Sequence, residues 1–330
     1  MLCEHIGLGG ATLDAYLLER IPAVAATQAR PCVVVLPGGG YGHLSARESE
    51  PVALRFCGEG LHACVLRYSV APARWPQALV EAAGALALLR ERSAEWGIDP
   101  ARIYVAGFSA GGHLAGCLGA FWNQPWLAER AGRLLATVSV PERELAPGKG
   151  PAPQAAPMRG ACAPVCEDIR PSALVLGYPV ITSGAFGHHG SFETLCAPGL
   201  PDAADPASLG ASSTGELVSR LSLEHRVTEA WPPTFLWHTF DDQSVPVENS
   251  LLLAAALHES GVPAELHVFP HGPHGSALGV AETAMDKCGE LVCDPASGRV
   301  TSRNNAQVQP DTIATWPDLA LRWLRSLPVR

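Results

Sequence analysis

Short apolar runs recur along the chain, and segments with helical spacing of their apolar positions separate most of them. Runs of five or six apolar residues are typical of strands that are buried on both faces. We expect such strands at residues 32–36, 62–66, 102–106, 173–177, 234–238 and 264–269. We expect helices at residues 76–92, 110–120, 247–260 and 316–327. Because strands that alternate with helices need right-handed crossovers, this order predicts an α/β fold, with a mostly parallel central sheet and helices on both faces.

Local signals support several of these elements. The helix at 76–92 begins with a proline and carries one apolar face, formed by Leu79, Ala82, Ala83, Leu86 and Leu89. The helix at 247–260 ends at Gly261-Val262-Pro263, a sequence that stops a helix. Residues 12–19 precede the first clear strand, and we expect them to add an antiparallel edge to the sheet.

Two segments lack this regular pattern. Residues 141–171 are dense in Pro, Ala and Gly, and residues 284–310 are polar and irregular. We interpret both as insertions into a single domain that spans residues 1–330. The sequence allows two interpretations of the insertions: lids or subunit contacts at the rim of a site, or surface loops.

Composition and charge narrow the class of protein. Hydrophobic residues make up 47% and charged residues 17% of the 330 residues, as expected for a soluble globular chain with a large core. The formal charge of −9 disfavours nucleic acid as a partner. It permits a homodimer without requiring one. The first residues lack a signal-peptide pattern and no apolar stretch approaches the roughly 20 residues that span a bilayer, so we expect a cytoplasmic protein without a membrane partner.

Ten cysteines are present. Three lie in apolar stretches and are expected to be small buried side chains: Cys32, Cys64 and Cys117. Four others form close pairs, Cys162 with Cys166 and Cys288 with Cys293. Neither pair has the spacing or the histidines of a zinc site, so we expect no metal. A local disulfide stays open, although all ten thiols should be free in a reducing compartment.

The clearest chemical signal is the pentapeptide Gly107-Phe108-Ser109-Ala110-Gly111. It follows an apolar run and precedes a helix rich in Ala, Gly and Leu, and this is the setting of a nucleophile elbow. Glycine is needed at the flanks because the turn leaves no room for Cβ atoms. We therefore predict that Ser109 is a nucleophile. The alternative is an ordinary glycine-rich turn between a strand and a helix.

A serine nucleophile needs a base, and the base needs a carboxylate to orient it. After the predicted strand at 234–238 come Asp241 and Asp242, and the pattern Asp-x-x-Val-Pro favours Asp242, with Asp241 supporting the loop. After the strand at 264–269 come His271 and His274, of which we favour His274 as the base. The chain order Ser, Asp, His agrees with the order expected for such loops.

A glycine-rich loop, Leu36-Pro37-Gly38-Gly39-Gly40-Tyr41, follows the first predicted parallel strand. Catalysis of acyl transfer needs backbone N–H groups that point at the developing oxyanion. We predict that Gly39, Gly40 and Ala110 supply them. A phosphate cradle is the rival interpretation, but the loop lacks both the G-x-G-x-x-G spacing and a lysine.

Further polar and aromatic residues lie near these loops. His113 follows the nucleophile on the same helix and is expected to hold the elbow by a hydrogen bond rather than to take part in the chemistry. Candidate substrate contacts are Tyr41, Tyr68, Tyr178, His188 and His189.

Together these motifs carry a family resemblance. To those already described are added Leu66-Arg67-Tyr68-Ser69-Val70-Ala71-Pro72 and Tyr178-Pro179-Val180-Ile181. From about residue 30 to 280, and again in the last helix, the chain resembles an α/β-hydrolase. It is most similar to bacterial acetyl-xylan-esterase-like and feruloyl-esterase-like enzymes, which are related to the dienelactone-hydrolase and prolyl-oligopeptidase groups. The insertions depart from the family pattern.

This resemblance implies a Ser-His-Asp carboxylesterase without metal or organic cofactor. Ser109 matches the family nucleophile, Asp242 its acid and His274 its base. The expected substrate is a small-molecule or oligosaccharide ester, with acetyl groups on sugars favoured by resemblance alone. The alternatives are a serine peptidase or acyltransferase on the same fold, and a binding protein that kept the fold without catalysis. An oligopeptidase is disfavoured because the chain has no room for an extra propeller domain.

Overall fold

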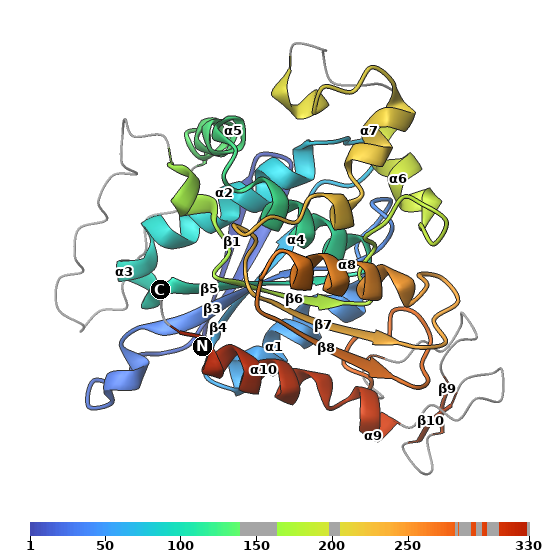
Figure 1. The fold of residues 1–330 in the computed structure, drawn as a ribbon. Coiled ribbons are helices and arrows are strands. Elements are labelled where there is room, and N and C mark those ends of the chain that lie inside the picture. Colours follow the sequence, from blue (N-terminus) through green and yellow to red (C-terminus); the bar gives the residue numbers. More distant parts are fainter. Residues whose placement is uncertain are drawn as a thin grey trace.

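The computed structural model describes residues 1–138, 164–197, 205–280, 283, 292–294, 299–301 and 310–328 (Figure 1). Its central sheet has eight strands in the order β1-β2-β4-β3-β5-β6-β7-β8. Their bounds are β1 Leu2–Leu8, β2 Ala11–Leu17, β3 Arg30–Leu36, β4 His62–Arg67, β5 Ile98–Phe108, β6 Ala173–Gly177, β7 Thr234–Thr239 and β8 Ala264–Phe269. From β4 to β8 all neighbours run parallel. The predicted mostly parallel sheet is confirmed.

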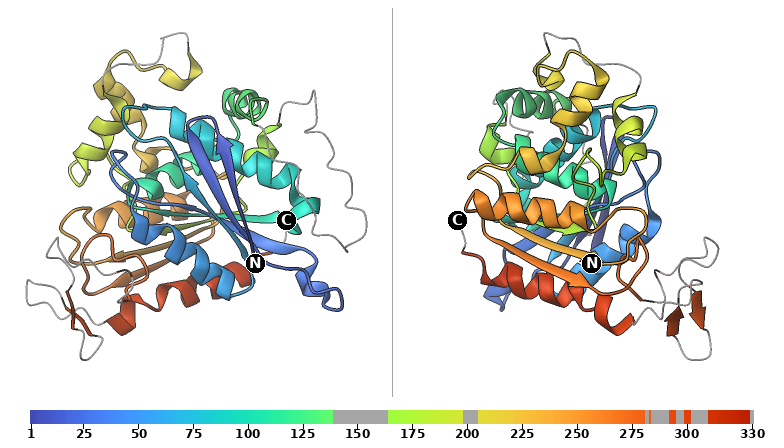
Figure 2. Two further views of the ribbon diagram at one scale, coloured as in Figure 1. Left: turned by 180° about the vertical axis from the view of Figure 1, so that it is seen from behind. Right: turned by 45° about the vertical axis from the view of Figure 1, so that its right-hand side comes forward.

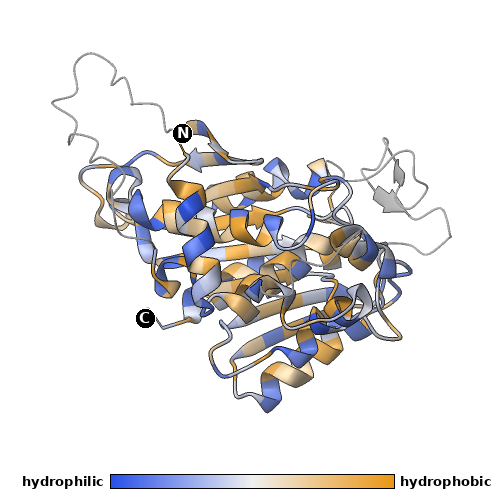
Figure 3. Cartoon of the chain, turned by 90° about the horizontal axis from the view of Figure 1, so that it is seen from above, coloured by the Kyte–Doolittle hydropathy of each residue, from blue (hydrophilic) through white to orange (hydrophobic). Residues whose placement is uncertain are grey.

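Helices cover both faces of this sheet (Figures 1 and 2). One face carries α2 Gln77–Glu91, α4 Ala110–Phe121 and α8 Glu248–Glu259, and the other carries α1 Glu50–Gly58 and α10 Trp316–Ser326. The remaining helices are α3 Ser93–Trp96, α5 Pro125–Leu135, α6 His189–Cys196, α7 Thr214–Arg220 and α9 Pro310–Ile313. Apolar residues concentrate along the strands between the two helical layers (Figure 3).

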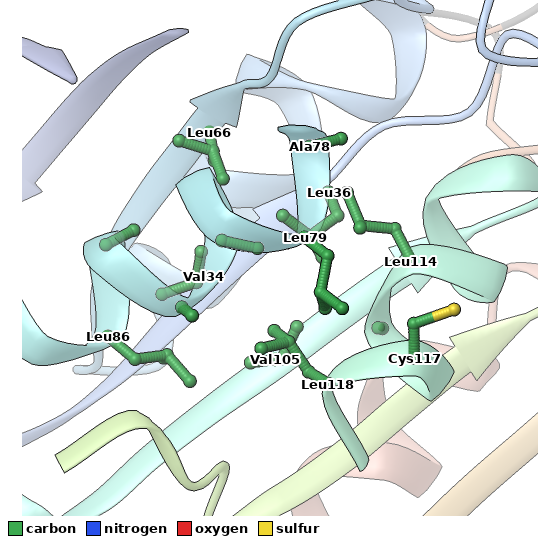
Figure 4. Packing of buried hydrophobic residues seen from close by; sticks show 14 of the residues in the cluster. Val34, Leu36, Leu66, Ala78, Leu79, Leu86, Val105, Leu114, Cys117 and Leu118 are labelled. Atoms are coloured by element: carbon green, nitrogen blue, oxygen red, sulfur yellow. The ribbon is translucent and has the colours of Figure 1, made fainter. Parts of the chain in front are cut away.

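The core is divided by the sheet into two clusters of buried side chains. In the first, Leu79 and Leu86 of α2 and Leu114 of α4 pack against Val34 and Val105 of the sheet (Figure 4). The second lies beneath α1 and α10. Burial at roughly 25 cal/mol per Å² of apolar surface is the main stabilising term for such a core, and it makes the sheet a rigid base for the loops at its edge.

Helix α2 is more deeply buried than its sequence predicts. One apolar face was expected, but every residue from Ala78 to Leu89 is buried, including the carboxyl group of Glu81. The reason is that α5 packs on the outer side of α2, so the helix lies between the sheet and a second helix. Helix α5 was not among the predicted helices, so burial of α2 on two sides was not expected.

The N-terminal strands correct a second expectation. Residues 12–19 were expected to form the edge of the sheet, and β2 is indeed antiparallel to β4. However, β1 pairs with the other side of β2 through the full register from Leu2↔Leu17 to Leu8↔Ala11, so β1 is the edge strand. The pattern of β1 was missed because Glu4 interrupts the apolar positions on its buried side, between Leu2 and Ile6.

Most of the predicted insertion at 141–171 lies outside the described residues. Its last residues, from 164 on, are described: Cys166–Ile169 form a 3-10 helix that contacts α2, and Ile169 is fully buried. Within the second predicted insertion, at 284–310, β9 Val292–Asp294 and β10 Arg299–Thr301 pair as an antiparallel ribbon, and the other residues up to 309 lie outside the described part.

Cys32, Cys64 and Cys117 are fully buried, as expected. The seven cysteines whose side chains the structure describes are free thiols: Cys3, Cys32, Cys57, Cys64, Cys117, Cys166 and Cys196. Of the two predicted pairs, Cys166 is among these seven, whereas Cys162 and Cys288 lie outside the described residues. None of the helices in the described ranges is both long and apolar enough to cross a bilayer.

Candidate active site

Every residue predicted to take part in the chemistry follows a strand at the same edge of the sheet. The glycine loop follows β3, Ser109 follows β5, Asp242 follows β7 and His274 follows β8. Because these strands are parallel, their carboxyl ends lie together, and the loops converge although the sequence separates them widely.

Ser109 occupies a strained turn between β5 and α4. Its backbone angles, φ of 53° and ψ of −121°, lie in a region that residues other than glycine rarely adopt. The flanking glycines permit the turn: a Cβ atom on Gly107 would lie 2.3 Å from the carbonyl oxygen of Gly111, and one on Gly111 would lie 2.1 Å from the carbonyl oxygen of Leu36. The turn places the Ser109 hydroxyl at the amino end of α4, next to the glycine loop.

The three predicted side chains form a hydrogen-bonded relay. The Oγ atom of Ser109 lies 2.8 Å from Nε2 of His274, and Nδ1 of His274 lies 2.7 Å from Oδ2 of Asp242. These distances fit a hydroxyl that donates to Nε2 and an Nδ1–H that donates to the carboxylate. The Asp242 side chain is fully enclosed, whereas the His274 side chain is 19% exposed.

The surroundings of Asp242 keep it ionised and oriented. Its Oδ1 accepts the backbone N–H groups of Ser244 at 2.8 Å and Val245 at 2.9 Å. Burial would by itself raise the pKa of the Asp242 carboxyl, but the imidazoles of His238 and His274 and the N–H of Val245 outweigh it and hold that pKa well below its usual range. A permanently charged carboxylate favours an imidazolium at His274.

Asp241 does not reach the relay. Its Oδ1 accepts the N–H of Gly272 at 2.8 Å, and its Oδ2 lies 3.1 Å from Nδ1 of the exposed His271. The side chain of Asp241 therefore links the loop after β7 to the loop after β8 through two hydrogen bonds. This is the supporting position expected for Asp241.

The glycine loop passes directly against the elbow. A Cβ atom on Gly38 would lie 2.8 Å from Cβ of Ser109 and 2.9 Å from the carbonyl oxygen of Phe108. Gly39 and Gly40 have φ angles of 127° and 61°, a backbone that glycine adopts readily. Ala110 is the first residue of α4, where the helix dipole favours negative charge. The predicted oxyanion-binding N–H groups thus belong to two segments in contact with each other.

His113 and Tyr41 form a buried pair behind this loop. The Tyr41 hydroxyl lies 2.8 Å from Nδ1 of His113, and Nε2–H of His113 donates to the carbonyl of Leu221 at 3.0 Å. Burial lowers the pKa of His113 to about 4, so its ring is neutral and fully bonded at neutral pH. His113 therefore has the supporting role predicted for it.

The three tyrosines proposed as substrate contacts are all buried and bonded to the protein. Tyr68 donates its hydroxyl to the carbonyl of Pro37 at 2.6 Å, and Tyr178 donates to Oε1 of Glu48 at 2.7 Å. Tyr41, Tyr68 and Tyr178 are exposed by 3% or less. These hydroxyls hold the loops that form the site, because each makes an internal hydrogen bond. A substrate contact by any of these tyrosines stays a prediction.

His188 lies beside the relay and is half-buried. Its Nδ1 accepts both the hydroxyl of Ser191 at 2.9 Å and the Ser191 N–H at 3.3 Å, so the neutral ring carries its proton on Nε2. Burial, and then the charge of His274, lower the pKa of His188. His189, the first residue of α6, is exposed. A substrate contact by His188 stays a prediction.

Several supporting residues were missed by the sequence analysis. His238 is fully buried and lies 3.6 Å from Oδ2 of Asp242. Asn249 binds the backbone of the loop after β6 with its amide oxygen and that of Pro246 with its amide nitrogen. Arg47 and Glu48 link the glycine loop to other segments. Single polar residues in a strand, a helix or a short turn carry no sequence signal for such roles, because the pattern along the chain does not show which groups they will contact.

A pocket of about 370 Å³ lies at the opposite edge of the sheet. Its lining includes residues that precede the parallel strands, such as Arg102, Ser172, Pro233 and Pro263. We do not assign the reaction to this pocket, because the residues predicted as nucleophile, base and orienting carboxylate all lie at the carboxyl ends of the strands. Among the described residues, no cluster of three or more metal-binding side chains is present.

Comparisons with known proteins agree with this architecture. A model of the BD-FAE family matches residues 14–143, and one of the prolyl oligopeptidase family matches residues 210–285. The endo-1,4-beta-xylanase B of Butyrivibrio fibrisolvens is 32% identical over 250 residues, which are 74% of this chain and 32% of that protein. The chain spans only about a third of the length of the curated relatives that it matches.

Solved structures match over much more of their length. The carboxylesterase Cest-2923 from Lactobacillus plantarum WCFS1 is 26% identical, with a TM-score of 0.68, and the match covers 98% of this chain and 97% of that one. The acetyl ester-xyloside bifunctional hydrolase from Caldicellulosiruptor lactoaceticus is 35% identical, with a TM-score of 0.65 and coverage of 96% and 88%. A relationship this close over the whole sheet, together with the nucleophile elbow, means that the chain belongs to the esterases of the α/β-hydrolase superfamily.

Proposed function

We propose that this protein is a carboxylic ester hydrolase that removes acyl groups, and acetyl groups in particular, from carbohydrates. The observation that carries the proposal is the relay of 2.8 Å and 2.7 Å from Ser109 through His274 to Asp242, beside a loop of glycine N–H groups. The relay contains the nucleophile, the base and the orienting carboxylate that ester cleavage by a serine requires.

In the first half of the reaction, Oγ of Ser109 attacks the ester carbonyl while Nε2 of His274 takes the hydroxyl proton. The carbonyl π electrons move to the oxygen, and the N–H groups of Gly39, Gly40 and Ala110 stabilise the resulting oxyanion. When the tetrahedral intermediate collapses, the bond to the alcohol oxygen breaks and Nε2–H of His274 gives its proton to that oxygen. An acyl-enzyme on Ser109 and a free alcohol result.

In the second half, water takes the place of the alcohol. His274 removes a proton from the water as its oxygen attacks the acyl carbon, and the same N–H groups stabilise the second oxyanion. Collapse of this intermediate breaks the bond to Oγ, and the proton on Nε2 returns to Ser109. The products are the carboxylic acid and the regenerated enzyme, and Asp242 stays ionised throughout.

Similarity to other proteins supports a carbohydrate ester as the substrate. The relatives described above include an acetyl ester-xyloside hydrolase and a xylanase. Both names point to esters or glycosides of xylose, so acetylated xylo-oligosaccharides are the substrates to test first. The preference for sugar esters rests on this similarity and not on any particular residue of the described site.

The test compares the protein with Ser109→Ala on three substrates: acetylated xylo-oligosaccharides, p-nitrophenyl acetate and p-nitrophenyl octanoate. We expect acetate release and fluorophosphonate labelling from the unaltered chain, and neither from Ser109→Ala. Preferential hydrolysis of the octanoate would refute the acetyl preference. Intact hydrolysis by Ser109→Ala, or no hydrolysis and no labelling in either protein, would refute the mechanism, and the latter would favour a binding protein.

A peptidase is the second candidate. The segment that matches the prolyl oligopeptidase family, residues 210–285, contains both Asp242 and His274. The same relay could cleave an amide, with His274 protonating the leaving amine. Cleavage of an aminoacyl p-nitroanilide at a kcat/KM above that for p-nitrophenyl acetate would favour this candidate.

A further inference from the structure

A short turn connects the glycine loop with the loop that carries the catalytic histidine. Residues Ala46–Glu48 form a 3-10 helix between β3 and α1, and Glu48 is only 2% exposed. Its Oε2 accepts the N–H of Gly38 at 2.7 Å, and its Oε1 accepts the hydroxyl of Tyr178 at 2.7 Å. One buried carboxyl group thus binds both the glycine loop and the residue that follows β6.

The same turn reaches the histidine loop by two routes. The Tyr178 oxygen accepts the N–H of Ala277 at 3.0 Å, and the Tyr178 ring packs against that of His274 at 5.0 Å between centroids. Arg47 donates from Nη1 to the carbonyl oxygen of Gly275 at 2.6 Å. Two neighbouring residues of one turn are therefore bonded, directly or through one tyrosine, to the main chain on the C-terminal side of His274.

We propose that Arg47 and Glu48 act as a clamp that sets the position of the oxyanion-binding loop relative to His274. The proposal rests on the esterase function above and adds to it a positioning residue, Glu48. The transition state needs the glycine N–H groups and the imidazole in one fixed arrangement around Ser109, and the clamp is a direct link between the two loops that supply them.

The geometry explains why a carboxylate stands at position 48. Each of its oxygens faces a donor, the Gly38 N–H on one side and the Tyr178 O–H on the other. A glutamine has one oxygen and one NH2 group, so it can accept only one of these hydrogen bonds. The other donor would lose its acceptor inside the protein, and the loop attached to it would shift to find another partner.

Tyr178 itself is held in a strained conformation. Its φ is 35°, a value that a tyrosine rarely adopts, and its side chain is 1% exposed. Such a conformation persists where surrounding contacts determine it, and the bonds to Glu48 and Ala277 are two of these contacts. Burial, followed by the charge of Glu48, raises the pKa of Tyr178 well above its usual value, so the hydroxyl keeps the proton that it donates.

The test uses Glu48→Gln and Tyr178→Phe, with Glu81→Gln as a matched control. Glu81 is also a fully buried glutamate, and its oxygens accept from the N–H and hydroxyl of Ser69 and from Gln77. Its substitution leaves the same kind of unpaired donor in the core, outside the Glu48–Tyr178 link. Each variant is assayed for kcat and KM on p-nitrophenyl acetate, for stability in urea, and for the affinity of butylboronic acid, which forms a tetrahedral adduct with a serine.

We expect Glu48→Gln to lower kcat by roughly tenfold to a hundredfold while KM stays within about twofold, because only the transition state uses the aligned loop. The affinity for butylboronic acid should fall by a similar factor. Glu81→Gln should lose stability and keep kcat within about twofold. The double variant Glu48→Gln/Tyr178→Phe should have about the same kcat as the less active of the two single variants, because each substitution breaks the same link between Glu48 and Tyr178.

Other results would overturn the clamp. A kcat for Glu48→Gln equal to that of Glu81→Gln would refute the clamp and leave the proposed ester hydrolysis intact. Losses of kcat that multiply in the double variant would also refute the clamp. If Glu48→Gln does not fold, Tyr178→Phe decides alone, and an unchanged kcat in that variant refutes the proposal. A wild-type protein that neither hydrolyses esters nor reacts with a fluorophosphonate would instead refute the proposed function, and the clamp with it.

Discussion

Asp242→Asn should reverse the tautomer of His274 without changing the shape of the site. In the native protein, Oδ1 of Asp242 accepts two backbone N–H groups, from Ser244 and Val245, and Oδ2 faces Nδ1 of His274 at 2.7 Å. An asparagine keeps the two backbone bonds only if its oxygen takes the Oδ1 position. Its NH2 group then faces His274 and donates to Nδ1, which leaves the imidazole proton on Nε2, opposite Ser109.

The size of the effect follows from this geometry. A ring with its proton on Nε2 cannot accept the proton of Ser109, and the loss of the correct tautomer in a serine triad costs on the order of 10⁴ in kcat, or about 5.5 kcal/mol. The opposite orientation of the amide in Asp242→Asn is also unfavourable. It would turn the NH2 group toward the N–H groups of Ser244 and Val245 and leave two donors without an acceptor, at roughly 1–3 kcal/mol each.

The assay is kcat on p-nitrophenyl acetate at pH 7.5, with the rate of fluorophosphonate labelling of Ser109 as a second measure. Asp241→Asn is the matched control, because an asparagine there can still accept the Gly272 N–H and can donate to Nδ1 of His271. We expect that control to stay within about threefold of wild type. A kcat for Asp242→Asn within tenfold of wild type, or equal losses in both variants, would refute the assignment of Asp242.

Three further variants test the elbow, the pH dependence and the core. Gly111→Ala places a Cβ 2.1 Å from the carbonyl oxygen of Leu36 and should lower kcat by about a hundredfold, whereas Gly58→Ala, with no atom within 4 Å of the new Cβ, should not; equal activities would contradict the elbow geometry. Burial lowers the pKa of His62 from 6.5 to about 4, so the stability due to its neutral form is complete above pH 6.5 and is lost as the pH falls toward 4. The unfolding free energy in urea should therefore fall between pH 6.5 and 4.5 by roughly 2 kcal/mol more in the wild type than in His62→Gln, and parallel pH profiles would refute this. Trp316→Ala removes a fully buried side chain and should cost about 3–5 kcal/mol of unfolding free energy; a loss below 1 kcal/mol would show that α10 contributes little to the core.

The parallel part of the fold could be predicted from local pattern alone. The strands expected at 173–177 and 264–269 match β6 and β8 residue for residue. In β6 the signal is a continuous apolar run, as expected of a strand buried on both faces, whereas β8 is a partly exposed edge strand whose apolar residues alternate with Glu265 and His267. The chain order of Ser109, Asp242 and His274 predicted which loops should meet, since each follows a parallel strand. The structure brings these three side chains into hydrogen-bond contact.

What local pattern could not supply is the partner of each buried polar group. Glu48 follows an arginine in a polar stretch and has the sequence context of a surface residue, yet it is buried because Gly38 and Tyr178 need its oxygens. The tyrosines near the loops are buried for the same reason, because their hydroxyls bind to distant parts of the protein. A tyrosine beside a site can turn its hydroxyl toward the substrate or toward the protein, and only the distant chain decides which.

These hidden bonds bear on how mutations should act. The proposed reaction uses only backbone N–H groups and three side chains. Their alignment, however, depends on buried polar residues that bind main-chain groups of other segments, such as Glu48 and Asn249. Preorganised donors stabilise a transition state because they need no rearrangement as charge develops. A substitution that loosens one of these supports should therefore leave substrate binding nearly intact and lower the rate of the chemical step. KM would then report on the residues that face the substrate, and kcat on the buried polar network behind them.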